Sequence, residues 1–146
     1  MHLIIMSILG IEFTVSREID PGDLERVWRA LSDISSMPRY WRGHREIEIL
    51  NADNNTYIAR IRFAFPGPSN RGLARIEVHN DGKLVLINYV KGPIKGYVMN
   101  YISGNSLISQ WNISISPLFL IMKSWIKRHF MSGTSNALAR IIGDET

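Results

Sequence analysis

The chain has 146 residues, of which 45% are hydrophobic and 21% charged, and its net charge is +4. These values are typical of a globular protein with a sizeable core, and we expect residues 1–146 to form a single domain. The chain contains no cysteine, which excludes disulfide and thiolate chemistry and fits a cytoplasmic location, and its apolar runs are shorter than the roughly 20 residues of a membrane span.

The first predicted elements are a strand and two short helices. Ile11–Ile19 alternates apolar and polar residues, as a half-buried strand does. Asp20 is suited to cap the next helix, which begins at Pro21 and extends to about Leu31. A second short helix is predicted over Ile34–Met37, and we expect the proline that follows to limit it.

The middle of the chain predicts six further strands, because apolar runs are separated at regular intervals by residues that favour turns. The connections are short, so neighbouring strands should pair antiparallel as a meander. The predicted strands are Arg45–Leu50, Tyr57–Phe65, Leu73–His79, Leu84–Lys91, Lys95–Ile102 and Leu107–Ile115.

A long helix is predicted over Leu118–Ile142, which follows Pro117. Apolar residues recur at steps of three and four along it, while its basic residues fall largely off that stripe. The stripe should therefore be buried against the sheet, and Gly133 is where we expect a bend or extra room. The predicted stripe consists of Leu118, Met122, Trp125, Ile126, Phe130, Ala137 and Ile141.

This order of elements predicts an α+β fold with a curved antiparallel sheet around the last helix. Local features match one family: the strand leading into Ile19–Pro21, the helix end Val27–Asp33, the stretch Pro38–Trp41, and the ending Ala137–Ile142. On these features the chain resembles the START/Bet v 1-like (SRPBCC) superfamily, most of all its polyketide cyclase/dehydrase, lipid transport and CoxG-like branch. The resemblance implies the helix-grip fold, in which seven strands wrap a C-terminal helix and two short helices lie between strands one and two.

The resemblance also implies an apolar cavity between sheet and helix for a lipid-, quinone-, aromatic- or polyketide-like molecule. Residues two apart in a strand share a face, so alternation indicates which side chains line the cavity. In Lys95–Ile102 we expect the face with both tyrosines to point inward, whereas Leu84–Lys91 leaves Tyr89 and Asn88 as alternatives. The candidate ligand-binding residues are Trp41, Ile61, Phe63, Tyr89, Tyr97, Met99, Tyr101, Trp111, Ile113, Met122, Trp125, Ile126 and Phe130.

The sequence lacks motifs for metal, cofactor or covalent chemistry. Its four histidines show no metal-ligand spacing, and it has no nucleophile elbow, phosphate-binding glycine loop or dinucleotide fingerprint. We therefore predict no metal, no cofactor and no assigned catalytic residue. Basic residues are scattered rather than gathered in a stripe, so no nucleic-acid partner is expected.

Three functions are consistent with these patterns. The first is a carrier or sensor that binds a small hydrophobic molecule without catalysis. The second is a polyketide cyclase/dehydratase-type enzyme, in which a tyrosine such as Tyr97 or the lone helical His129 would move a proton. The third is an accessory protein at a membrane surface, since Leu118–Phe130 mixes apolar and basic residues, although the fold needs the same stripe for its core. The oligomeric state is left open.

Overall fold

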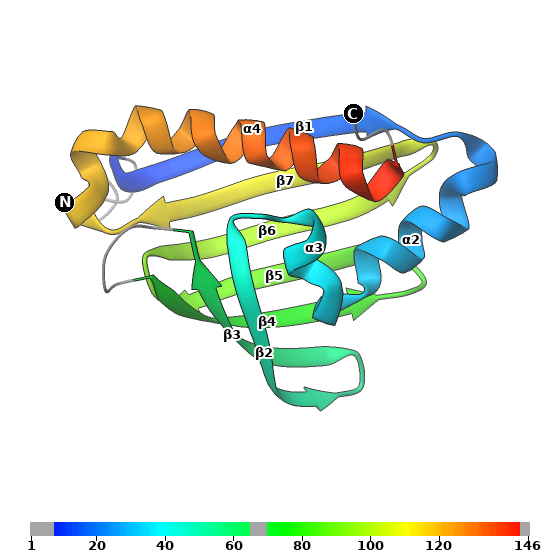
Figure 1. The fold of residues 1–146 in the computed structure, drawn as a ribbon, viewed down its shortest axis with the longest axis horizontal. Coiled ribbons are helices and arrows are strands. Elements are labelled where there is room, and N and C mark those ends of the chain that lie inside the picture. The colour runs from blue at the N-terminus through cyan, green and yellow to red at the C-terminus, as the bar shows by residue number, and fades with distance from the viewer. Residues whose placement is uncertain (1–7, 65–69, 144–146) are drawn as a thin grey trace.

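The computed structural model describes residues 8–64 and 70–143. Within these residues the chain forms seven antiparallel strands in the spatial order β1-β7-β6-β5-β4-β3-β2 (Figure 1). Six strands follow one another as a meander, and β1 pairs with the last strand. The strands are β1 Gly10–Glu18, β2 His44–Asp53, β3 Thr56–Phe63, β4 Arg71–His79, β5 Leu84–Lys91, β6 Ile94–Ser103 and β7 Ser106–Ile115.

The predicted helix-grip fold is confirmed. The sheet curves around a long C-terminal helix, and two short helices lie between β1 and β2 (Figure 1). The predicted strands agree with the observed ones to within a few residues at each end. Phe65, the predicted end of β3, lies outside the described residues.

The two short helices are α2, Leu24–Ser32, and α3, Met37–Tyr40, each preceded by a short 3₁₀ turn. The prediction that Pro38 limits the second helix is wrong. Pro38 lies in the first turn of α3, where its missing N–H breaks no helical hydrogen bond. As a result α3 carries the chain directly to the start of β2.

The C-terminal helix has two parts. A 3₁₀ segment, Pro117–Met122, precedes the α-helix α4, Lys123–Ile142. The α-helix continues without a break through Gly133, where a bend or extra room was predicted, and a Cβ at Gly133 would meet no atom within 4 Å. Among the helices of the described residues, none combines the length and apolar character that a membrane crossing requires.

Three arginines fix the position of α4. Arg17 of β1 donates from Nε to the carbonyl oxygen of Ser135 at 3.1 Å. Arg26 of α2 donates from Nη2 to the carbonyl of Ile142 at 2.6 Å, at the helix C-terminus, where carbonyls lack helical partners. Arg140 donates from Nη1 to the carbonyl of Tyr40 at 2.9 Å and so ties α4 to the end of α3.

The concave face of the sheet carries the core, and the cross-strand register identifies its members. In β6, Val98 lies opposite Trp111 of β7 and Ile87 of β5, and all three side chains are buried. Asn100 follows on the same parity and is only 2% exposed. The expectation that Tyr97, Met99 and Tyr101 point inward is therefore wrong, because these residues have the opposite parity and are half-buried on the outer face.

The outer face is polar at the β2–β3 edge. Arg60 and Glu48 form an ion pair with 2.7 Å between Nη1 and Oε1, and Arg62 and Glu46 form a second at 2.8 Å. The hydrogen bond and charge of Arg62 lower the pKa of the Glu46 carboxyl below its ordinary value. These arginines therefore pair across strands on the solvent face.

Candidate ligand-binding site

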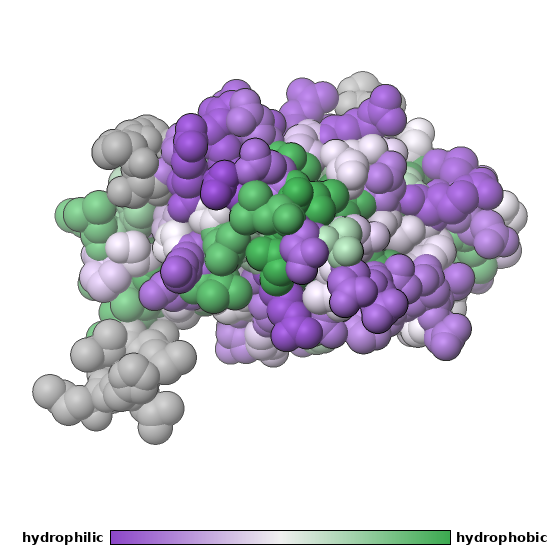
Figure 2. Space-filling view, turned by 90° about the horizontal axis from the view of Figure 1, so that it is seen from below, coloured by the Kyte–Doolittle hydropathy of each residue, from purple (hydrophilic) through white to green (hydrophobic). Residues whose placement is uncertain are grey.

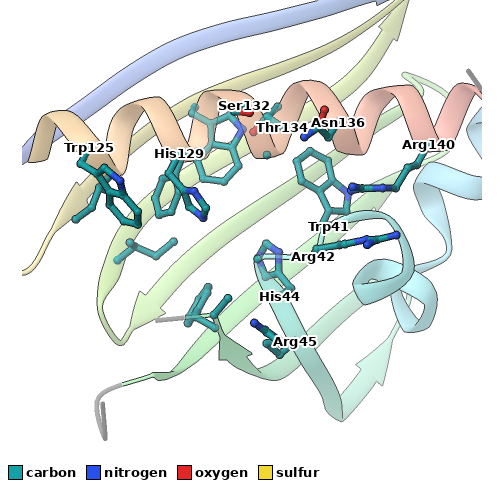
Figure 3. Close-up of a pocket in the computed structure, with 18 residues that line it drawn as sticks. Trp41, Arg42, His44, Arg45, Trp125, His129, Ser132, Thr134, Asn136 and Arg140 are labelled. Atoms are coloured by element: carbon teal, nitrogen blue, oxygen red, sulfur yellow. The ribbon is translucent and has the colours of Figure 1, made fainter. Parts of the chain in front are cut away.

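A pocket of about 360 Å³ lies between α4 and the concave face of the sheet. Figure 3 shows α4 along one wall and the segment from Trp41 to Arg45 along the opposite wall. On the face seen in Figure 2, hydrophobic side chains gather in a central group with hydrophilic ones around it. The remaining wall comes from Phe63, Ala64, Ile94 and Trp111 of the sheet.

Trp111 is the centre of the aromatic part of the pocket. Its ring stacks on Phe13 of β1 at a centroid distance of 5.3 Å. Phe130 of α4 and Trp41 contact it from other sides, with centroids at 5.4 and 6.4 Å. Trp41, Trp111 and Phe130 thus form an aromatic wall of the pocket, and Phe13 supports the Trp111 ring outside the pocket lining.

A second aromatic group surrounds His44. The His44 ring lies 5.5 Å from Phe63 and 5.9 Å from Tyr89, centroid to centroid, and Phe63 lies 5.8 Å from Tyr89. Gly72 makes room for Phe63, because a Cβ at Gly72 would lie 2.8 Å from the Phe63 ring. His44 is 5% exposed and shares a hydrogen bond of 2.7 Å between Nε2 and the Tyr89 hydroxyl.

The local chain fold places His44 at the pocket. After α3, the N–H of Trp41 donates to the carbonyl of Met37 at 2.9 Å, and the N–H of His44 donates to the carbonyl of Trp41 at 3.0 Å. This tight turn directs Trp41 and His44 to the same side of the chain (Figure 3). His44 then lies opposite Phe63 in the β2–β3 register.

Burial keeps both polar partners uncharged. Removal from water lowers the pKa of His44 from 6.5 to about 4, and it raises the pKa of the Tyr89 hydroxyl above its ordinary value. At neutral pH the pair is therefore a neutral imidazole bonded to a neutral phenol. Two buried polar atoms in the described residues have no hydrogen-bond partner, Nδ1 of His44 and Oγ1 of Thr134, and both residues line the pocket.

A contrasting polar cluster lies beside the pocket on β6 and β7. Ser109 donates from its hydroxyl to Oδ1 of Asn100 at 2.5 Å, and Nε1–H of Trp111 donates to the same hydroxyl oxygen at 3.0 Å. Asn100 and Ser109 are buried, with 2% and 0% exposure. The chain of bonds fixes the Trp111 ring against the sheet and so shapes the pocket wall.

The rim of the pocket is basic. Arg42, Arg45 and Arg140 line it, and no carboxylate is found among its described lining residues. Figure 3 shows Arg140 reaching from α4 toward Trp41 and Arg42. His129 also lies at the rim, where its ring stacks on Trp125 at a centroid distance of 4.9 Å.

The structure places six of the predicted ligand-binding residues on the pocket wall. Trp125 is among them only at the rim, because its side chain is 51% exposed. As ligand contacts all of these residues stay predictions. The six are Trp41, Phe63, Trp111, Trp125, Ile126 and Phe130.

The other predicted residues lie elsewhere. Ile61 and Ile113 are core residues of the concave face, with 0% and 2% exposure, and Tyr89 lies behind His44. Met122 is 42% exposed at the end of the 3₁₀ segment, so its predicted place in a buried stripe is wrong. Four of the thirteen candidates therefore point away from the pocket. They are Met122 and the three outward-facing residues of β6, Tyr97, Met99 and Tyr101.

Sequence reasoning missed two polar residues of the pocket, His44 and Thr134. His44 stands at the first position of β2, and its partner Tyr89 is 45 residues away in the sequence. Thr134 lies within a helix, where a threonine carries no signal of its own.

Metal chemistry finds no support in the part of the chain that the structure describes. No group of three or more histidine or acidic side chains is close enough there to hold a metal ion.

The sequence matches the family model described as polyketide cyclase / dehydrase and lipid transport over residues 21–118. No curated protein sequence matches the chain. Solved structures with a similar fold include Zhui aromatase/cyclase from Streptomyces sp. R1128, at 16% identity over 92% of each chain and a TM-score of 0.63. A STAR-related lipid transfer protein from Xanthomonas axonopodis is 11% identical over 88% of this chain and 82% of its own, with a TM-score of 0.61.

Norcoclaurine synthase from Thalictrum flavum is similar over 91% of this chain and 85% of its own, at 15% identity and a TM-score of 0.57. Identities this low establish a shared fold, which supports several unrelated functions.

Proposed function

Because the chain belongs to the polyketide cyclase/dehydrase and lipid transport family, we propose that it binds and carries a small hydrophobic molecule between α4 and the sheet. We place this carrier in the cytoplasm, in keeping with a chain that has no cysteine. The observation that supports the proposal most is the pocket of about 360 Å³ with walls of tryptophan and phenylalanine.

The size and lining of the pocket suit this function. Ligand sites in proteins are commonly about 300–1,000 Å³, mostly apolar, with a few polar groups that orient the ligand. Here the apolar walls come from Trp41, Trp111 and Phe130, and the polar groups are His44 and Thr134. Each 100 Å² of apolar ligand surface removed from water would contribute about 2.5 kcal/mol before the entropic cost of binding.

Filling the pocket tests the proposal. Gly133 lines it, and a Cβ at this position would meet no atom within 4 Å, so Gly133→Leu should project into open space. We expect the wild type to bind the neutral fluorescent probe N-phenyl-1-naphthylamine with one-to-one saturation, and Gly133→Leu to bind it at least about tenfold more weakly.

Gly82→Leu is the matched control, since Gly82 also has open space around it but lies in the β4–β5 turn. It should bind the probe as the wild type does. Absence of saturable binding to the wild type, or equal binding by the two leucine variants, would contradict the carrier function.

The hydrogen-bonded pair of His44 and Tyr89 supports a second candidate, a cyclase or dehydratase. A neutral imidazole beside a bound polyketide-like substrate could accept a proton, with Tyr89 as the residue that orients it. This replaces Tyr97, which faces outward, and His129, which lies at the rim. Tyr89→Phe should then lower the turnover of a poly-β-ketone thioester while probe binding persists, whereas unchanged turnover would exclude the pair from catalysis.

A further inference from the structure

Exposed hydrophobic side chains gather where the C-terminal helix begins. Of nine large hydrophobic residues that are exposed within the described residues, six lie between Leu118 and Met131. Ile121 is 96% exposed, Leu118 76% and Trp125 51%. Single exposed apolar residues are ordinary, but a contiguous group marks an interaction surface.

The turn between β5 and β6 extends this group. The N–H of Ser116 donates to the carbonyl of Pro93 at 3.1 Å, so this turn lies beside the start of the 3₁₀ segment. The turn follows β5, in which Val90, next to the last residue, is 50% exposed. In Figure 2 hydrophobic side chains reach the left end of the molecule, where Figure 1 places the start of the C-terminal helix. We call this surface the apolar end and define it as Val90, Leu118, Leu120, Ile121, Met122 and Trp125.

The stretch of chain that forms the apolar end carries charge of one sign. From Gly82 to Gly143 the sequence contains no aspartate or glutamate, although the whole chain has 13 of them. Over the same stretch it contains seven basic residues, five of them close in sequence to the apolar end. These five are Lys91, Lys95, Lys123, Lys127 and Arg128.

A surface of apolar side chains with basic residues close to it in sequence fits one kind of binding partner better than others. An anionic lipid surface offers hydrocarbon for the apolar side chains and negative headgroups for the lysines. A second copy of this chain would instead bring two positive ends together, which disfavours association. Tryptophan at position 125 also suits the boundary between headgroups and acyl chains.

The apolar end is continuous with the pocket. Trp125 belongs to both, because it lines the pocket and is half-exposed at its rim (Figure 3). A molecule held against a membrane by this end would have its pocket rim at the lipid surface.

We propose that the apolar end docks on anionic membranes and inserts Leu118 and Ile121 among the lipid headgroups. The docking stands independently of the carrier function, while its purpose, the loading or delivery of a ligand at the membrane, rests on that function.

Vesicle co-sedimentation tests the docking with the protein as it is. Phosphatidylcholine vesicles with phosphatidylglycerol should bind the wild type at low salt, and high salt or omission of phosphatidylglycerol should weaken binding. Ile121→Asp should weaken it by about tenfold. Replacing Lys127 and Arg128 by glutamine should weaken it at low salt by about fivefold for each charge.

Leu50→Asp is the matched control, because Leu50 is 45% exposed but lies on β2, away from the apolar end. It should bind vesicles as the wild type does. Ile121 is almost fully exposed, so Ile121→Asp should leave the melting temperature unchanged, and probe binding in solution should persist.

Three outcomes would overturn the proposal. The first is no binding to anionic vesicles at low salt, and the second is an equal loss in Ile121→Asp and Leu50→Asp. The third is a dimer in sedimentation velocity that Ile121→Asp converts to monomer without any vesicle binding, which would assign this surface to a second copy. None of these outcomes bears on probe binding by Gly133→Leu, so docking and carriage fail separately.

Discussion

Two polar clusters on the concave face differ in how completely their hydrogen bonds are made. In the first, the Ser109 hydroxyl donates to Asn100 and accepts from Trp111, so both functions of the hydroxyl are used. In the second, His44 and Tyr89 share one bond, and Nδ1 of His44 has no partner in the described residues. We call them the closed and the open cluster.

This difference in hydrogen bonding distinguishes a structural role from a functional one. A satisfied network strengthens a core and fixes one arrangement, whereas an unpaired buried polar group costs stability. Such a cost persists mainly where a site uses the group. The closed cluster therefore holds Trp111 in place, and we propose that the open cluster contacts the ligand.

The largest expected difference between the two clusters is in how the free energy of unfolding responds to acid. Folding lowers the pKa of His44 from 6.5 to about 4, so between these values the unfolded chain binds more protons than the folded one. The free energy of unfolding should therefore fall as the pH drops through this window, by up to about 3 kcal/mol. Urea denaturation at a series of pH values measures it.

His44→Phe should remove this part of the pH dependence, because phenylalanine does not titrate. Ser109→Ala should keep it, since the closed cluster contains no titratable group. Equal pH dependence in wild type and His44→Phe would contradict the assignment to His44.

Breaking the closed cluster should have the next largest effect. Ser109→Ala leaves Oδ1 of Asn100 and the Trp111 N–H without their partner, and we expect the free energy of unfolding to fall by about 2 kcal/mol. Urea denaturation at neutral pH measures the change. The control is Ser114→Ala on the half-buried outer side of the same strand, which should change stability by less than about 0.5 kcal/mol.

Removing the hydroxyl of Thr134, which lines the pocket with His44, should increase the free energy of unfolding instead of lowering it. Thr134 is 1% exposed and its Oγ1 has no partner, so Thr134→Val replaces an unsatisfied polar atom with a methyl group of similar size. We expect the free energy of unfolding to rise by about 1 kcal/mol. A loss of stability in thermal and urea unfolding would show that the hydroxyl is satisfied in solution.

The smallest effect should come from Gly133, beside Thr134. Gly133→Ala raises helix propensity at a position where a Cβ meets no neighbour, so the free energy of unfolding should rise by about 0.8 kcal/mol. Gly82→Ala, in a turn, provides the comparison without a helix. Destabilisation by Gly133→Ala would mean that the pocket wall is packed at this point.

Much of the fold was predictable because its signals are local. Turn residues between short apolar runs predicted the strands, and short connections predicted their antiparallel order. These patterns depend on backbone preferences over a few residues, and tertiary contacts did not override them.

The orientation of β6 was not predictable from the same patterns. Aromatic bulk favoured the face of Tyr97 and Tyr101, but the strand buries Val98 and Asn100 instead. Asn100 tolerates burial because Ser109 lies directly opposite it in β7. Alternation identifies two faces, and only the partner strand decides which one is buried.

The prediction for the start of the C-terminal helix was wrong for a geometric reason. The predicted stripe assumed 3.6 residues per turn from Leu118 onward. Pro117–Met122 is instead a 3₁₀ segment, which has about three residues per turn. The phase of the stripe therefore differs before and after Lys123. Ile126, Ala137 and Ile141 are buried as predicted, while Leu118 and Met122 are exposed. Trp125, in the first turn of α4, is also exposed, and the change of phase does not explain it.

Residue types and spacing thus predicted a curved antiparallel sheet around a C-terminal helix and an aromatic wall, because periodicity records which residues avoid water. They did not identify the open cluster or the apolar end. His44 of β2 meets Tyr89 of β5 although β3 and β4 lie between these strands in the sheet, and the β5–β6 turn meets the start of the 3₁₀ segment through the bond from Ser116 to Pro93. Such contacts between residues far apart in sequence leave no periodic trace, and the tertiary structure alone creates them.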